Sequence, residues 1–123
     1  MSDVLAIVEQ REGHVRGVSS EVVSVAAQVA RETGGTAHAL MIGGPGMSAA
    51  GAEMGRFGAE KILAVENEAL LAYHPQGYAQ VVTEAVRAGV YGSVVFAKKI
   101  DGPGGSFQAV GQGFGLKLFL TDN

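Results

Sequence analysis

Two glycine-rich segments have the residue types and spacing that could hold a phosphate group. Gly44 to Ala49 reads G-x-G-x-x-A between an apolar run and a helical pattern, and Glu66 ends the next apolar run as a candidate ribose ligand. Gly102, Gly105 and Gly115 have the spacing G-x2-G-x9-G, and backbone amides freed by glycines can surround a phosphate. Because the chain has 19 glycines, such spacings also arise by chance, and a tight strand-to-helix turn is the simpler interpretation of the first segment.

The other side chains that could do chemistry do not form a recognisable catalytic or metal-binding pattern. His14, His38 and His74 are scattered without metal-ligand spacing, and the chain has no cysteine. Acids near expected strand ends could serve as general bases, although solvated loop positions are the commoner role for acids. These acids are Glu9, Glu66 and Asp101. We therefore expect neither a catalytic residue nor a metal site.

Composition and charge argue against some classes of partner and bear on where the protein is located. The formal net charge is -3 and charged residues make up 17% of the chain, so the basic surface that nucleic acid requires is missing. The longest apolar runs have the length of strands and fall far short of the roughly 20 residues that cross a bilayer. The start of the sequence has no secretion or transit pattern, so we expect a cytoplasmic protein.

Apolar runs and helical periodicity divide the chain into alternating strands and helices. Short apolar runs predict strands at 4–9, 37–42, 61–65, 93–97 and 117–120. Amphipathic patterns predict helices at about 19–33, 47–57 and 75–88, the first with Ser19 or Ser20 as N-cap and Gly34-Gly35 as its stop. Six glycines among the fifteen residues from Asp101 to Gly115 disfavour a full helix there.

Strands that alternate with helices predict right-handed parallel crossovers. We therefore expect an α/β fold, a Rossmann-like three-layer domain with a mostly parallel sheet of about five strands. A hydrophobic fraction of 47% is sufficient for one core, so residues 1–123 are expected to form a single domain.

Four segments carry a resemblance to a known family. They are VLAIVEQREGHVR with the helix after it, GGTAHALMIGG, FGAEKILAVENEALLAYHPQGYAQVV and SVVFA, and together they cover residues 1 to about 97. In type and order they resemble the amino-terminal domain of the electron transfer flavoprotein alpha subunit. The most distinctive part is Tyr73-His74-Pro75 followed by Tyr78, which is similar to the family's Tyr-x-Pro entry to a helix.

The resemblance implies a protein-interaction role in electron transfer, with no chemistry by this domain itself. In the family, most FAD contacts come from a separate carboxy-terminal domain, so FAD is implied for the full assembly and not for this chain alone. The family's amino-terminal alpha domain packs against the beta subunit, which holds an AMP, while dehydrogenases supply electrons. The implied partner is an electron transfer flavoprotein beta subunit or a second copy of this chain. Lys98 and Lys99 are expected to contribute to the contact with it.

A second resemblance supports a different function. The glycine spacing of Gly102, Gly105 and Gly115 resembles the ATP loop of universal stress proteins, which share this general architecture, the adenine nucleotide alpha hydrolase-like fold. Leu116 stands where those proteins have Ser or Thr. This alternative predicts a small module that binds AMP or ATP near the carboxyl ends of the strands.

Overall fold

The computed structural model describes residues 2–8, 10–11, 14–15, 17–70, 75–97 and 105–121. Within these residues five strands form one parallel sheet in the order β5-β4-β1-β6-β7. The strands are β1 (Asp3–Val8), β4 (Ala37–Gly43), β5 (Lys61–Glu66), β6 (Tyr91–Ala97) and β7 (Lys117–Thr121). A two-stranded hairpin, β2 (Gln10–Arg11) with β3 (His14–Val15), follows β1. The predicted parallel sheet is therefore confirmed.

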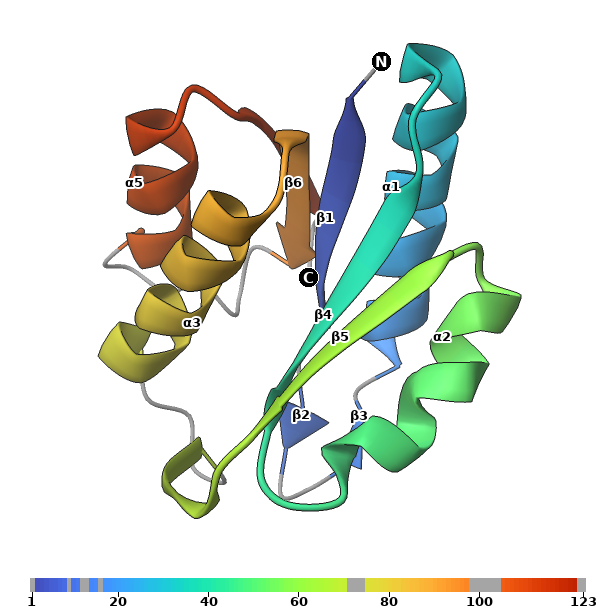
Figure 1. The fold of residues 1–123 in the computed structure, drawn as a ribbon. Coiled ribbons are helices and arrows are strands. Elements are labelled where there is room, and N and C mark those ends of the chain that lie inside the picture. Colours follow the sequence, from blue (N-terminus) through green and yellow to red (C-terminus); the bar gives the residue numbers. More distant parts are fainter. Residues whose placement is uncertain are drawn as a thin grey trace.

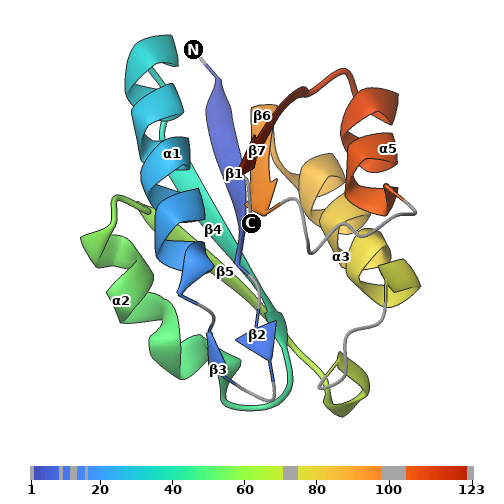
Figure 2. The same ribbon diagram turned by 180° about the vertical axis from the view of Figure 1, so that it is seen from behind.

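Helices cover both faces of this sheet. Figures 1 and 2 show α1 (Val18–Thr33) and α2 (Gly51–Arg56) on one face and α3 (Pro75–Ala88) and α5 (Ser106–Gly113) on the other. Two 3-10 turns, η1 (Met47–Ala50) and η2 (Glu68–Leu70), precede α2 and α3. In the part of the chain that the structure describes, none of the helices has the length and apolar character of a bilayer span.

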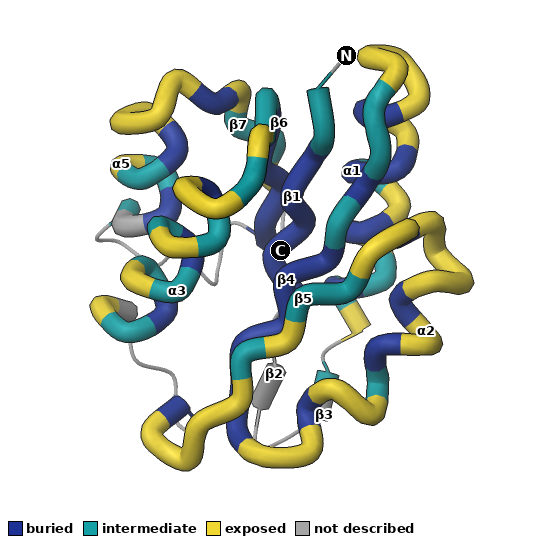
Figure 3. Tube along the Cα trace, viewed as in Figure 1, coloured by how far each residue is buried: buried dark blue, intermediate teal, exposed yellow. Residues whose placement is uncertain are grey.

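The central strand β1 explains why the chain folds in this way. Val4 to Val8 are almost completely buried, because β4 and β6 flank β1 and helices pack on both of its faces (Figure 3). A strand buried on both faces has no polar side to alternate with, and this is why it reads as an uninterrupted apolar run.

Ser2 and the start of β1 lie against the connection from α1 to β4 and against the start of β6. The hydroxyl of Thr33 donates to the Ser2 carbonyl oxygen at 3.2 Å, and the Val4 amide donates to the Thr36 carbonyl at 2.9 Å. A side chain at Gly35 would overlap the Ser2 carbonyl, and one at Gly92 would lie 2.5 Å from the Ser2 Cβ. The close approach of Ser2 therefore requires glycine at both positions.

The start of α1 differs from its prediction. Gly17 is the N-cap, while Ser19 is buried in the first turn and the Ser20 hydroxyl donates back to the Gly17 carbonyl at 2.8 Å. The predicted serine cap is wrong because the helix begins at Val18, before either serine. The predicted stop is confirmed, since Gly34 has the left-handed conformation (φ 77°) that glycine adopts most easily.

The helix predicted over 47–57 is a 3-10 turn joined to a short α-helix. Met47 and Met54 are buried as expected, but Phe57 follows the helix and is 38% exposed. The third helix begins at Pro75 and buries Tyr78, Val82 and Val86, as predicted.

The glycines between Asp101 and Gly115 disfavoured a helix in the sequence analysis. That prediction is wrong for Ser106–Gly113, which form α5. Phe107 is 1% exposed and packs edge-to-face on Phe96 of β6, with ring centroids 5.7 Å apart. At Gly111 an added Cβ would overlap the Leu118 side chain on β7, so this glycine allows α5 to lie close to the sheet. Burial of Phe107 outweighs the roughly 1 kcal/mol that each helical glycine costs relative to alanine.

Candidate functional site

The G-x-G-x-x-A turn lies after β4, where a nucleotide would be expected in such a sheet. The structure brings Glu66 to it, as the sequence suggested, but in another role. The Ser48 amide donates to Glu66 Oε2 at 2.7 Å. This amide and the Ser48 hydroxyl lower the pKa of the Glu66 carboxyl below its usual 4.5. Glu66 therefore bonds to the amide that a phosphate would need, and the tight-turn interpretation is the better one.

The second glycine pattern is divided by a helix. Gly105 precedes α5 with φ 62°, and Gly115 follows it with φ 70°. An eight-residue helix is about 12 Å long, so these two glycines lie at opposite ends of it. Gly102 lies outside the described residues. The structure thus does not bring Gly105 and Gly115 around one phosphate.

Several other sequence candidates cannot be placed. Glu9, Tyr73, His74, Lys98, Lys99 and Asp101 lie outside the described residues, as does the side chain of His14. Among the residues that are described, His, Asp and Glu side chains do not form a group of three that could hold a metal ion.

A polar network that the sequence analysis missed lies where β1, β4 and β6 begin. His38 of β4 is 2.8 Å from the Tyr91 hydroxyl through Nδ1 and 2.9 Å from the Thr36 hydroxyl through Nε2. The backbone amide and hydroxyl of Thr36 both donate to Asp3 Oδ1, at 2.9 and 3.1 Å. The His38 and Tyr91 rings also meet edge-to-face.

The capacity of each group to donate or accept determines which atom carries the proton in each hydrogen bond of this network. The ionised Asp3 carboxylate only accepts, so the Thr36 hydroxyl donates to it and accepts from His38 Nε2–H. His38 Nδ1 is then unprotonated in the neutral ring and accepts from the Tyr91 hydroxyl. The Thr36 amide bond is the main cause that lowers the pKa of Asp3, and burial raises the pKa of Tyr91.

The sequence contained a signal for this network. The amino ends of parallel strands meet at one edge of a sheet, and here Asp3, His38 and Tyr91 each stand near the start of an apolar run. The pairing could not be found without knowing that β6 lies beside β1 and that Tyr91 reaches across to β4. The hydrogen bonds of the network join the starts of β1, β4 and β6 to one another, so its geometry supports a structural role.

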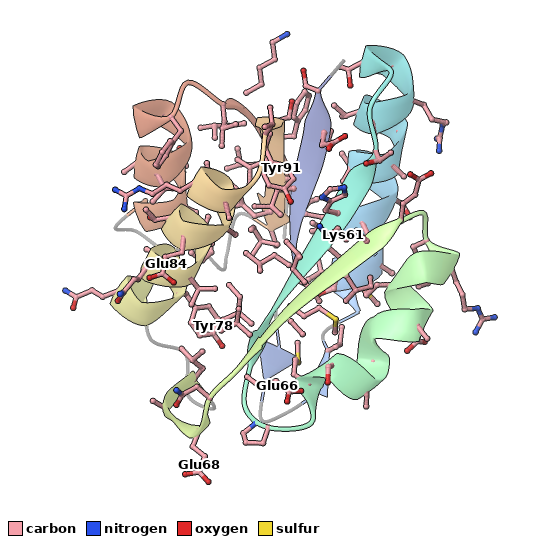
Figure 4. All side chains as sticks on the ribbon, in the orientation of Figure 1. Lys61, Glu66, Glu68, Tyr78, Glu84 and Tyr91 are labelled. Atoms are coloured by element: carbon pink, nitrogen blue, oxygen red, sulfur yellow. The ribbon has the colours of Figure 1, made fainter. Side chains whose placement is uncertain are left out.

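A groove of about 430 Å³ begins beside this network. It runs between the edge strand β5 and α3, and its lining includes Leu40, Leu63, Val65, Val81, Ala85 and Tyr91. Figure 4 shows Lys61 and Glu84 on its two sides, and both belong to its lining. Its apolar floor and charged walls resemble a protein-docking surface more than an enclosed catalytic cavity.

Comparison with known proteins identifies the family. The electron transfer flavoprotein subunit alpha of Syntrophomonas wolfei subsp. wolfei (strain DSM 2245B / Goettingen) is 28% identical over 102 residues. That match covers 83% of this chain and 31% of the relative, so the chain spans less than a third of the relative's length.

A solved structure has the same fold. The crystal structure of a universal stress protein in complex with cAMP superimposes with a TM-score of 0.55 at 17% identity, covering 98% of this chain and 96% of that one. This likeness confirms the predicted adenine nucleotide alpha hydrolase-like fold. The family model of the electron transfer flavoprotein domain matches residues 4–119, and the chain therefore belongs to the electron transfer flavoprotein domain family.

Proposed function

We propose that this domain is an alpha-subunit-like scaffold and subunit interface in electron transfer from dehydrogenases, without a catalytic site of its own. The observation that carries the proposal is the family match over residues 4–119. The relative named as an alpha subunit supports it. The partner is an electron transfer flavoprotein beta subunit or a second copy of this chain, and the location is cytoplasmic.

FAD belongs to the full assembly in this proposal. Two observations on the glycine segments support leaving FAD out of this domain. The Ser48 amide is bonded to Glu66, and Gly105 and Gly115 lie at opposite ends of α5. We therefore assign no FAD contact to this domain alone.

A binding experiment tests the scaffold role. The purified chain is titrated with a purified electron transfer flavoprotein beta subunit, and the complex is followed by sedimentation velocity. We expect a one-to-one complex, and we expect the chain alone to stay colourless when it is passed over a desalting column after incubation with FAD. Tight flavin binding by the chain alone, or no complex at any concentration, would contradict the proposal.

A small nucleotide-binding module is the second candidate. The observation that favours it is the shared fold with the universal stress protein that was solved with cAMP. Isothermal titration with AMP, ATP and FAD distinguishes the two candidates. Heat from ATP binding, with protection of the Gly105 and Gly115 amides, would support the nucleotide module and count against a purely structural domain.

A further inference from the structure

One side of β5 is directed toward α3, but a groove separates the two elements, so α3 does not cover the strand. The residues of β5 are exposed or half-buried along its whole length, whereas its neighbour β4 is buried at six of seven positions (Figure 3). The other side of β5 lies under α2, because an added Cβ at Gly51 would be 3.1 Å from the Ile62 side chain. Alternation along the strand then directs Leu63 and Val65 toward α3, into the groove.

The two walls of this groove carry opposite charges. Lys61 begins β5 on the strand wall, and Glu84 lies on the outer part of α3 (Figure 4). Neither side chain forms an ion pair with another residue of the described ranges, and the pKa of Asp3, which the Thr36 amide lowers most, is also lowered at longer range by the charge of Lys61. An occupant that pairs both charges must offer an acid opposite the strand wall and a base opposite the helix wall.

A second copy of this chain meets that requirement by symmetry. A two-fold axis that runs along the groove places the β5 wall of one copy over the α3 wall of the other. Lys61 at the rim of each groove then faces Glu84 of the other copy. A two-fold interface uses the same patch on both copies, so both ion pairs form together.

We propose that this groove, lined by β5 and α3, is the interface through which two copies of the chain associate. The inference rests on the second-copy alternative of the proposed function and assigns that contact to a surface. A monomeric chain that binds a beta subunit would overturn this inference and leave the scaffold role standing.

The charged walls determine how the association depends on salt. Lys61 and Glu84 are both exposed, so ions in solution screen the attraction between them. We therefore expect the dissociation constant to rise with salt concentration.

Charge reversal tests the interface. Lys61→Glu and Glu84→Lys each place like charges opposite one another twice in a symmetric dimer. We expect each variant alone to dimerise on the order of tenfold to a hundredfold more weakly than the original chain in sedimentation equilibrium. An equimolar mixture of the two variants restores both attractive pairs, so it should form a heterodimer of nearly the original affinity. The double variant K61E/E84K should also dimerise.

Two controls make the outcome decisive. Glu53→Lys changes the charge of an exposed residue on α2, away from the groove, and should leave the dimer unchanged. Circular dichroism of every variant checks that the fold is kept. A chain that is monomeric up to millimolar concentration, single variants that dimerise like the original, or a mixture that stays monomeric would each overturn the proposal.

Discussion

At the scale of residues, the network from Asp3 to Tyr91 shows how one edge of a parallel sheet is held together. Thr36, His38 and Tyr91 link the starts of three strands through hydrogen bonds of 2.8 to 3.1 Å. His38 and Thr36 each accept from one neighbour and donate to the next, while Tyr91 only donates and Asp3 only accepts, so removal of one hydroxyl leaves its acceptor without a donor.

Tyr91→Phe should therefore destabilise the domain. Loss of the hydroxyl leaves His38 Nδ1 without its donor, at a cost of about 1–2 kcal/mol in the free energy of unfolding. Urea denaturation measures this change. In a His38→Ala background the same substitution should cost much less, and an equal loss in both backgrounds would show that the hydroxyl acts elsewhere.

Asp3 makes stability depend on pH. Its pKa is lowered in the folded chain from the usual 3.8, mainly by the Thr36 amide, so the folded state favours the ionised form. The stabilisation is fully present above about pH 3.8 and is lost as the pH falls through the lower folded pKa. Asp3→Asn should be less stable than the original chain at pH 7, and the gap should narrow toward pH 2. Glu53→Gln on α2 provides the control, and a gap that does not change with pH would rule out this linkage.

At the scale of elements, the helices of this fold differ in how well sequence alone predicts them. The pattern of Val22, Ala26 and Val29 in α1 is strong because these residues form one buried face of a long helix. In α5 the glycine content points away from helix, and contact with α3, β6 and β7 stabilises it. The strands were predicted almost to the residue, since parallel strands are apolar throughout.

The candidate sites were less predictable than the fold for a related reason. A glycine spacing such as that of Gly105 and Gly115 describes distance along the chain, but α5 separates the two residues in space. The Glu66 position was predicted correctly, and its bond to Ser48 was not, because that bond depends on how η1 lies against β5. Side-chain contacts between elements depend on how the elements pack on the sheet, and local sequence patterns carry no information about that packing.

Two glycines of α5 should respond to alanine in opposite ways. At Gly113 an added Cβ meets nothing within 4 Å, so Gly113→Ala should stabilise the domain by about 0.5–1 kcal/mol through the unfolded chain. Gly111→Ala should destabilise it by about 1–3 kcal/mol, because the new methyl group overlaps Leu118. Thermal unfolding of both variants gives the comparison. If both shift stability in the same direction, the Leu118 side chain moves aside without cost and the packing does not require glycine at position 111.

At the scale of the whole molecule, stability should decrease from the centre of the sheet to its β5 edge. The strand β1 bonds to neighbours on both sides and is buried, whereas β5 bonds to β4 alone and is half-exposed. Local opening is easier where fewer apolar contacts must be broken.

Amide hydrogen exchange should reveal this gradient. We expect the amides of β1 to exchange slowest, near the rate set by global unfolding, and those of β5 to exchange faster. Raising the protein concentration should slow exchange in β5 and α3 and leave α1 and α2 unchanged if the groove is the self-association interface. A uniform change over all helices would instead indicate a general stabilisation.

Because Ser2 contacts Thr33, Gly35 and Gly92, position 2 is a suitable site for a probe of local unfolding. A small fluorescent dye attached at position 2, through Ser2→Cys, would lie at the place where the end of α1 and the starts of β4 and β6 come together. Its emission would change when these elements separate, before the rest of the sheet melts. The same crowding means that a large label at position 2 would itself loosen this contact, since Gly35 and Gly92 already leave no space for a Cβ beside Ser2.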